Sequence, residues 1–173
     1  MISSKLRLFF SIILTFIILA VSFFIPGIKN VYADDSSKIL ICIDPGHGGK
    51  DSGTTGPTGL KEKDANLDIA LRLKNKLVDA GFKVILTRES DINNSIDVLT
   101  GFANSNNPDL FISIRNNSHP SVDMNGTQSF YFSQSPYGKL LASFINARTI
   151  EQIGTVNRGV KSSNFKVLKN TKT

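Results

Sequence analysis

Residues 39–43 read Ile-Leu-Ile-Cys-Ile, an apolar and mostly β-branched run that ends in the loop sequence Asp-Pro-Gly-His-Gly-Gly. An apolar run without polar alternation is typical of a strand that is buried on both faces, as in a parallel sheet. Parallel strands need crossover connections, and these are usually helices. This one segment therefore favours an α/β fold.

The rest of the chain alternates between helical and extended patterns. Apolar residues at helical spacing predict a helix over residues 63–80, with Gly81 at its C-terminal cap. Further helices are predicted over residues 96–103 and 136–153, and further strands over residues 82–87, 109–114, 127–132 and 165–168. Together these elements predict one α/β domain over residues 34–173, with a mostly parallel, twisted sheet flanked by helices.

The first 33 residues have the pattern of an export segment. Lys5 and Arg7 precede an apolar stretch over residues 8–25, and Ala33 stands where a signal peptidase would cleave. The stretch is also about long enough to span a bilayer. Residues 1–33 are therefore predicted to be either a cleaved signal peptide or an N-terminal membrane anchor. In both cases residues 34–173 lie outside the membrane, and we expect a secreted or extracytoplasmic location.

Charge and cysteine content narrow the class of protein. The chain has 20 Lys and Arg against 14 Asp and Glu, a formal net charge of +6. Three of the cations and none of the acids lie in residues 1–33, which leaves +3 for the rest. Because no basic cluster is interleaved with aromatic residues, we expect no nucleic-acid partner. The single Cys42 lies within the apolar run and is predicted to be a buried core residue.

Two polar residues follow the predicted first strand, at the edge where parallel sheets place their sites. His47 lies among glycines that let a ligand approach the backbone, although it also fits an exposed histidine in a turn. Glu62 immediately precedes the first predicted helix, where the helix dipole favours a carboxylate whatever its function. If the loop brings them together, His47 and Glu62 form a nitrogen and oxygen pair suited to zinc.

Several ordered blocks of the sequence resemble one enzyme family. The blocks are Asp-Pro-Gly-His-Gly-Gly at 44–49, Glu-Lys-Asp at 62–64, Leu-Thr-Arg at 86–88, Phe-Ile-Ser-Ile at 111–114, Gly-Thr-Gln at 126–128 and Asn-Arg-Gly-Val at 157–160. In this order they resemble the zinc-dependent N-acetylmuramoyl-L-alanine amidases of the type-3 family. The resemblance covers residues 39–171, nearly all of the predicted domain.

The resemblance implies both a fold and a reaction. The family has a single α/β domain and hydrolyses the amide between N-acetylmuramic acid and L-alanine in peptidoglycan. It implies Zn²⁺ as the cofactor, held by His47, Glu62 and a histidine at position 115, with a glutamate on the last strand as general base. Zinc would lower the pKa of its bound water and polarise the amide carbonyl.

Two departures from this pattern affect the residues of the implied site. Position 115 is Arg115, which has no lone pair and therefore cannot be a metal ligand. His119 lies four residues further on and is a weak substitute for the missing ligand. The family's last strand, with its general-base glutamate, has no counterpart in these residues, because no acid follows Glu151. We therefore expect a domain that is incomplete at its C-terminus.

The sequence thus predicts an exported protein of the peptidoglycan amidase family whose own hydrolytic activity is impaired or absent. The alternative is a non-catalytic peptidoglycan-binding or regulatory module. Both predictions give peptidoglycan as the partner and the cell wall as the location. Contact with a membrane is expected only through residues 1–33, if they are not cleaved.

Overall fold

The structure is a computed structural model that describes residues 37–119, 121 and 123–173. The predicted signal peptide or anchor at residues 1–33 lies outside the described residues. Among the residues that are described, no helix is long and apolar enough to cross a membrane.

The first part of the domain is a three-stranded parallel sheet in the order β2-β1-β3. Its strands are β1 (Leu40–Pro45), β2 (Lys83–Leu86) and β3 (Leu110–Ile114). Helix α3 (Glu62–Asp79) connects β1 to β2, and helix α4 (Ile96–Asn106) connects β2 to β3. Strand β1 lies in the centre and is almost wholly buried, as its apolar sequence predicts. The core forms where α3 packs on this sheet, around Ile41, Ile43, Ala70 and Leu86.

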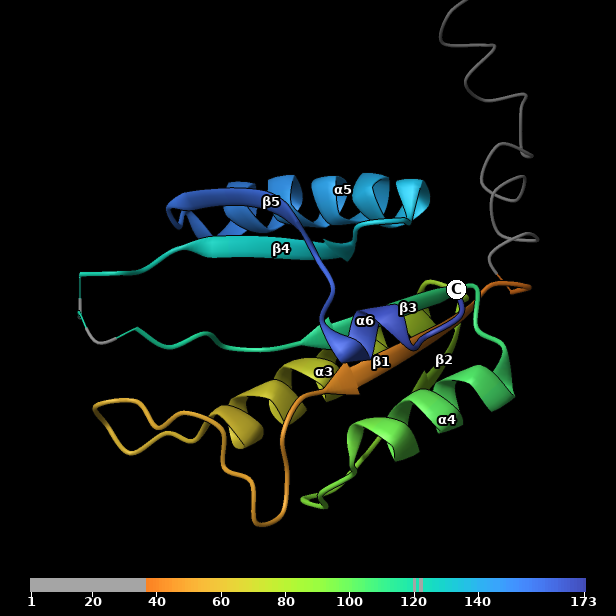
Figure 1. Cartoon of the computed structure of the whole chain (residues 1–173), viewed down its shortest axis with the longest axis horizontal. Helices are drawn as coiled ribbons and strands as arrows, with labels where there is room; N and C mark the ends of the chain where they lie inside the picture. Colours follow the sequence, from red (N-terminus) through yellow and green to blue (C-terminus); the bar gives the residue numbers. More distant parts are fainter. Residues whose placement is uncertain (1–36, 120, 122) are drawn as a thin grey trace, which may run out of the picture.

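The second part is a two-stranded parallel sheet of β4 (Thr127–Phe132) and β5 (Asn157–Ser163). Helix α5 (Pro136–Ile153) connects these strands and covers one face of the pair, as Figure 1 shows. The short helix α6 (Lys166–Lys169) follows β5 and lies close to α4 and β4. All strand pairings in the described residues are parallel, which confirms the predicted α/β class.

The prediction for the end of the domain is wrong. The sequence predicted a strand over residues 165–168, whereas the strand is Asn157–Ser163 and Lys166–Lys169 is helical. Strand β5 contains a single strongly apolar residue, Val160, and therefore lacks the hydrophobic signal on which strand prediction depends. The rings of Phe165 and Phe130 pack in an edge-to-face arrangement. The backbone carbonyl of Phe165 accepts hydrogen bonds from the amides of Leu168 and Lys169, which form the first turn of α6.

The other predicted elements are present, with small shifts in their bounds. Helix α4 continues to Asn106, three residues beyond the predicted end, and stops where Asn107 adopts the left-handed conformation typical of a helix C-terminus. The predicted burial of Cys42 is confirmed, since its side chain is fully inaccessible.

Candidate functional site

The loop after β1 holds His47 in a conformation that few residues other than glycine adopt. His47 has a φ of 63°, and Gly49 two residues later has a φ of 54°. These positive angles turn the chain sharply, so that the imidazole faces the start of α3. Its Nδ1 atom lies 2.8 Å from Oδ2 of Asp51, and this contact fixes the orientation of the ring.

Lys63 and Asp91 clamp this loop at Gly49. The Lys63 ammonium donates to the Gly49 carbonyl at 2.9 Å and to Asp91 at 2.5 Å, while the Gly49 amide donates to Asp91 at 2.7 Å. Both backbone groups of Gly49 are therefore bound by one ion pair. Because Lys63 follows Glu62 in α3, the clamp ties the histidine loop to the helix that carries the glutamate.

Arg88 also connects the histidine loop to the start of α3. Its side chain is buried and donates to the carbonyls of Pro45 at 2.8 Å, Gly46 at 3.2 Å and Lys63 at 2.8 Å. Sequence reasoning included Arg88, Lys63 and Asp91 in or beside family blocks but gave them no role. Cations are seldom buried, so composition and periodicity contain no signal for these contacts.

Glu62 begins α3 and is held by hydrogen bonds on both carboxylate oxygens. The Asn116 amide donates to Oε1 at 2.7 Å, and the amide and hydroxyl of Thr54 donate to Oε2 at 3.1 and 3.0 Å. Only 5% of the residue is exposed. Burial alone would raise the pKa of Glu62, but these hydrogen bonds outweigh it and the pKa lies below its ordinary value.

The structure brings His47 and Glu62 together. Nε2 of His47 lies 3.3 Å from Oε1 of Glu62, opposite the Asp51 contact on the other ring nitrogen. Two ligands of a tetrahedral zinc ion, with bonds of about 2.0–2.1 Å, are separated by about 3.3 Å. The spacing therefore suits two adjacent zinc ligands, although a direct hydrogen bond or ion pair has the same length.

The guanidinium of Arg115 contacts Ser113 and Asp44 and, among the described residues, forms no hydrogen bond or ion pair with His47 or Glu62. Its Nε atom lies 3.3 Å from Oγ of Ser113, and its Nη2 atom lies 3.4 Å from Oδ2 of Asp44. Asp44 is buried and also accepts hydrogen bonds of 2.7 Å from Thr87 and from Ser113. Arg115 and Asp44 line a cavity of about 140 Å³ that also contacts His47 and Asp51.

His119 does not join the pair. It lies in the exposed loop after β3, where its Nδ1 atom accepts a hydrogen bond of 3.0 Å from the Ser121 amide. Within residues 37–119, 121 and 123–173, no three His, Cys, Asp or Glu side chains are grouped so that they could hold a metal ion.

The donor set therefore does not fit a catalytic zinc ion. Such an ion normally has three protein ligands, whereas only His47 and Glu62 converge here and a donor-only guanidinium occupies position 115.

The fold and the site define the class of protein. It is a single α/β domain in which His47 and the buried Glu62 meet beyond the carboxyl end of β1. The model of the N-acetylmuramoyl-L-alanine amidase family matches residues 41–173. The chain belongs to this family, which confirms the resemblance seen in the sequence.

Known relatives agree in sequence and in fold. The chain is 41% identical over 134 residues to N-acetylmuramoyl-L-alanine amidase LytC of Bacillus subtilis, a match covering 76% of this chain and 27% of the relative. It is 34% identical over 145 residues to the probable cell wall amidase LytH of Staphylococcus saprophyticus, covering 83% of this chain and 47% of the relative. The structure of amidase AmiC2 of Nostoc punctiforme superposes with a TM-score of 0.74 at 36% identity, covering 79% of this chain and 75% of that one.

The matches do not extend over the whole length of the curated relatives. The chain covers 27%, 62%, 57% and 51% of four of them from Bacillus subtilis. The family assignment therefore applies to the domain described above.

Proposed function

We propose that this chain is an exported, cell-wall-associated member of the amidase family that contacts peptidoglycan but hydrolyses its muramoyl–alanine amide poorly or not at all. The observation that carries this proposal is the position of Arg115. The family resemblance implies a third zinc-binding histidine at that position, and this chain has a side chain that cannot bind a metal ion.

The contacts of Arg115 within the protein support the proposal that arginine, and not a metal-binding histidine, belongs at this position. Its guanidinium pairs with Asp44, which is 2% exposed, while 39% of the Arg115 side chain is exposed, so the protein holds one side of the arginine and the other side faces solvent. If the Arg115 side chain rotated toward the His47–Glu62 pair, Asp44 would lose one of its hydrogen-bond partners. It would also bring a positive charge toward any cation bound there, which Coulomb repulsion opposes.

Location at the cell wall is supported by two further observations. Residues 1–33 have the basic start and apolar stretch of an export segment, either cleaved after Ala33 or retained as an anchor. A relative that matches most of this chain is named as a probable cell wall amidase.

Replacing Arg115 by histidine tests the assignment of the metal position. We expect the full wild-type chain to hold less than one zinc ion per molecule at micromolar free zinc. Arg115→His should bind zinc at least about tenfold more tightly, because it supplies the third ligand. Arg148→His, an exposed change on α5, is the matched control and should leave zinc binding unchanged.

Two measurements separate the outcomes. Metal analysis gives the zinc stoichiometry, and digestion of purified peptidoglycan gives the release of L-alanine amino termini. The wild-type chain should release little. A wild-type chain that holds one tightly bound zinc ion and releases L-alanine termini rapidly would contradict the proposal.

One observation favours the non-catalytic binding module as a second candidate function. Position 115 carries a donor-only guanidinium, and binding to peptidoglycan, unlike zinc-dependent hydrolysis, needs no metal ligand there. Co-sedimentation with insoluble peptidoglycan tests this candidate, since a binding module should be retained by the wall material without degrading it.

A further inference from the structure

The two halves of the domain differ strongly in charge. Residues 124–173, which form β4, α5, β5 and α6, contain one acid, Glu151. The same residues contain seven cations, namely Lys139, Arg148, Arg158, Lys161, Lys166, Lys169 and Lys172. The single acid is already paired, because Glu151 accepts from Arg148 at 2.6 Å. No further acid in residues 124–173 is available to balance the other six cations.

Four of these cations are exposed lysines in β5, in α6 and just after it. Lys161, Lys166, Lys169 and Lys172 are all exposed, and none makes an ion pair with an acid of the described chain. We call these four residues, with Phe165 between them, the lysine surface.

The register of the second sheet places Lys161 on the face away from α5. The Ser129 hydroxyl contacts Asn146 of α5 at 3.4 Å, so Ser129 faces that helix. Because side chains alternate along a strand, Phe130 faces the opposite side. Lys161 is the β5 partner of Phe130, and the Phe165 ring lies 5.1 Å from the Phe130 ring on that same side.

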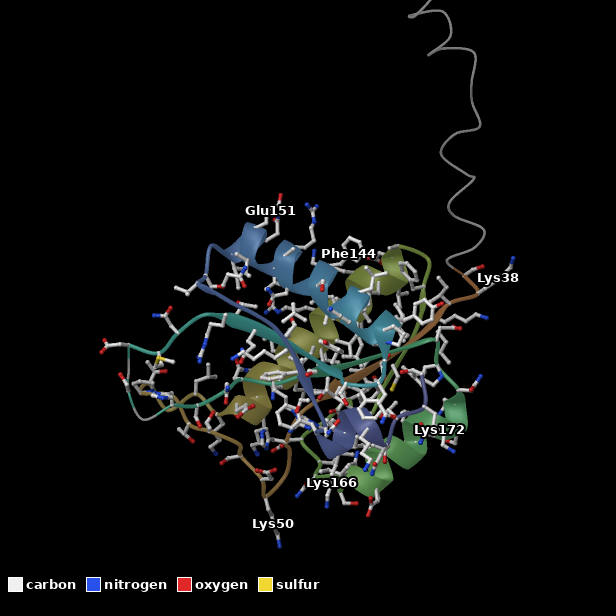
Figure 2. All side chains as sticks on the ribbon, turned by 45° about the horizontal axis from the view of Figure 1, so that its top comes forward. Lys38, Lys50, Phe144, Glu151, Lys166 and Lys172 are labelled. Atoms are coloured by element: carbon white, nitrogen blue, oxygen red, sulfur yellow. The ribbon has the colours of Figure 1, made fainter. Side chains whose placement is uncertain are left out.

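Helix α6 continues the surface from this point. Lys166 and Lys169 are three residues apart, and this spacing makes them neighbours on one face of a helix. The amide of Lys172 donates to Asn104 at 2.8 Å and holds this part of the chain against α4, which itself contacts α6. Figure 2 shows Lys166 and Lys172 on one side of the molecule, whereas Phe144 and Glu151 of α5 lie on the other.

We propose that the lysine surface binds a linear, phosphate-bearing polyanion of the cell envelope. The cations of this surface are all lysines, whose ammonium groups bind phosphate as point charges without a fixed geometry, whereas planar, bidentate recognition of a single carboxylate or phosphate favours arginine. Its residues are not among those that line the cavity beside Arg115, so the surface is separate from the His47–Glu62 site. Exposed charges spread over a strand and a helix suit a polymer better than a small ligand.

The inference relies on the proposed function only for the location outside the membrane, where such polymers are found. Binding at this surface needs neither zinc nor hydrolysis. Loss of polyanion binding and failure of the amidase proposal are therefore measured in separate experiments.

The test compares two double variants of the full chain that remove equal charge. Lys166→Gln with Lys169→Gln neutralises α6, and Lys76→Gln with Lys83→Gln neutralises two exposed lysines on α3 and β2 as the control. Each protein is titrated in a mild detergent with poly(glycerol phosphate) at low salt. The α6 variant should bind about tenfold more weakly than the wild-type chain, and its affinity should depend less steeply on salt.

The control variant should stay within about twofold of wild type, consistent with the weak effect of distant, screened charges. Equal weakening in both variants would mean that binding follows net charge and not this surface, and would overturn the proposal. So would unchanged binding in the α6 variant. Mixed micelles with an anionic phospholipid form a second arm, and an α6 effect seen on micelles but not on the polymer would assign the surface to a membrane instead.

Discussion

Nη2 of Arg115 lies 3.4 Å from Oδ2 of the buried Asp44, and the guanidinium passes directly beside Gly46. A Cβ atom at Gly46 would overlap the guanidinium, so glycine at this position leaves the space that Arg115 fills. Arg115 is thus part of an arrangement of at least three residues that contact one another, Gly46, Asp44 and Arg115 itself. The backbone of Gly46 has no positive φ, and space alone restricts this position.

A double-mutant cycle tests this arrangement. Gly46→Ala should push the flexible guanidinium away from Asp44, so Arg115→Ala should then cost less than it does in the wild-type chain. We expect a coupling free energy of about 0.5–1 kcal/mol, typical of residues in direct contact. Urea unfolding of the wild type, both single variants and the double variant gives this value.

The control for the cycle is Gly101→Ala in α4, where an added Cβ meets no atom within 4 Å. This change should stabilise the helix by about 0.8–1 kcal/mol and show no coupling to Arg115→Ala. Additive effects of Gly46→Ala and Arg115→Ala would contradict the packing described above.

The lowered pKa of Glu62 predicts a loss of stability in acid. A carboxyl whose folded pKa lies below its unfolded value binds fewer protons when folded, so its contribution is complete above about pH 4.3, the ordinary value. The contribution is lost as the pH falls through that value toward the folded pKa. Unfolding free energies at pH 7 and pH 4 should therefore differ less in Glu62→Gln than in the wild-type chain. Glu151→Gln on the surface of α5 is the control, and an equal reduction in both variants would argue against a specific role for Glu62.

Several features of the fold could be predicted because their signals are local. The apolar run at residues 39–43 identified β1, and regular helical spacing identified α5 with its observed bounds, Pro136–Ile153. His47 follows the end of β1, and Glu62 begins α3 at the same edge of the sheet. Their proximity therefore follows from the topology once the α/β class is assigned.

Other features depend on contacts between distant residues, and no local pattern reveals them. Strand β5 is polar and gains its place by pairing with β4. The direction of Arg115 is set by Asp44, which is 71 residues away in sequence. The division of the strands into a three-stranded and a two-stranded sheet also has no signature in hydrophobic periodicity.

The thiol of Cys42 should be inert in the folded protein. Burial, with a smaller contribution from the charge of Asp44, raises the pKa of Cys42 to about 12. Because the thiolate is the reactive form, iodoacetamide at pH 8 should label Cys42 only as fast as the domain unfolds. Labelling followed by mass spectrometry at increasing urea concentrations should trace the unfolding transition. Rapid labelling without denaturant would show that β1 is more accessible than its burial indicates.

The Lys63–Asp91 clamp predicts a specific change in loop dynamics. Asp91→Asn removes the charge that pairs with Lys63 and weakens the acceptor of the Gly49 amide. Hydrogen exchange at Gly49 should therefore accelerate by at least about tenfold, while exchange in the distant α5 should stay unchanged, because local opening involves only the bonds that are lost. Asp68→Asn, which removes an exposed partner of Arg72, is the matched control and should leave exchange at Gly49 unaltered. If Gly49 stays fully protected in Asp91→Asn, then Arg88 and Asn66 hold the histidine loop without help from the ion pair.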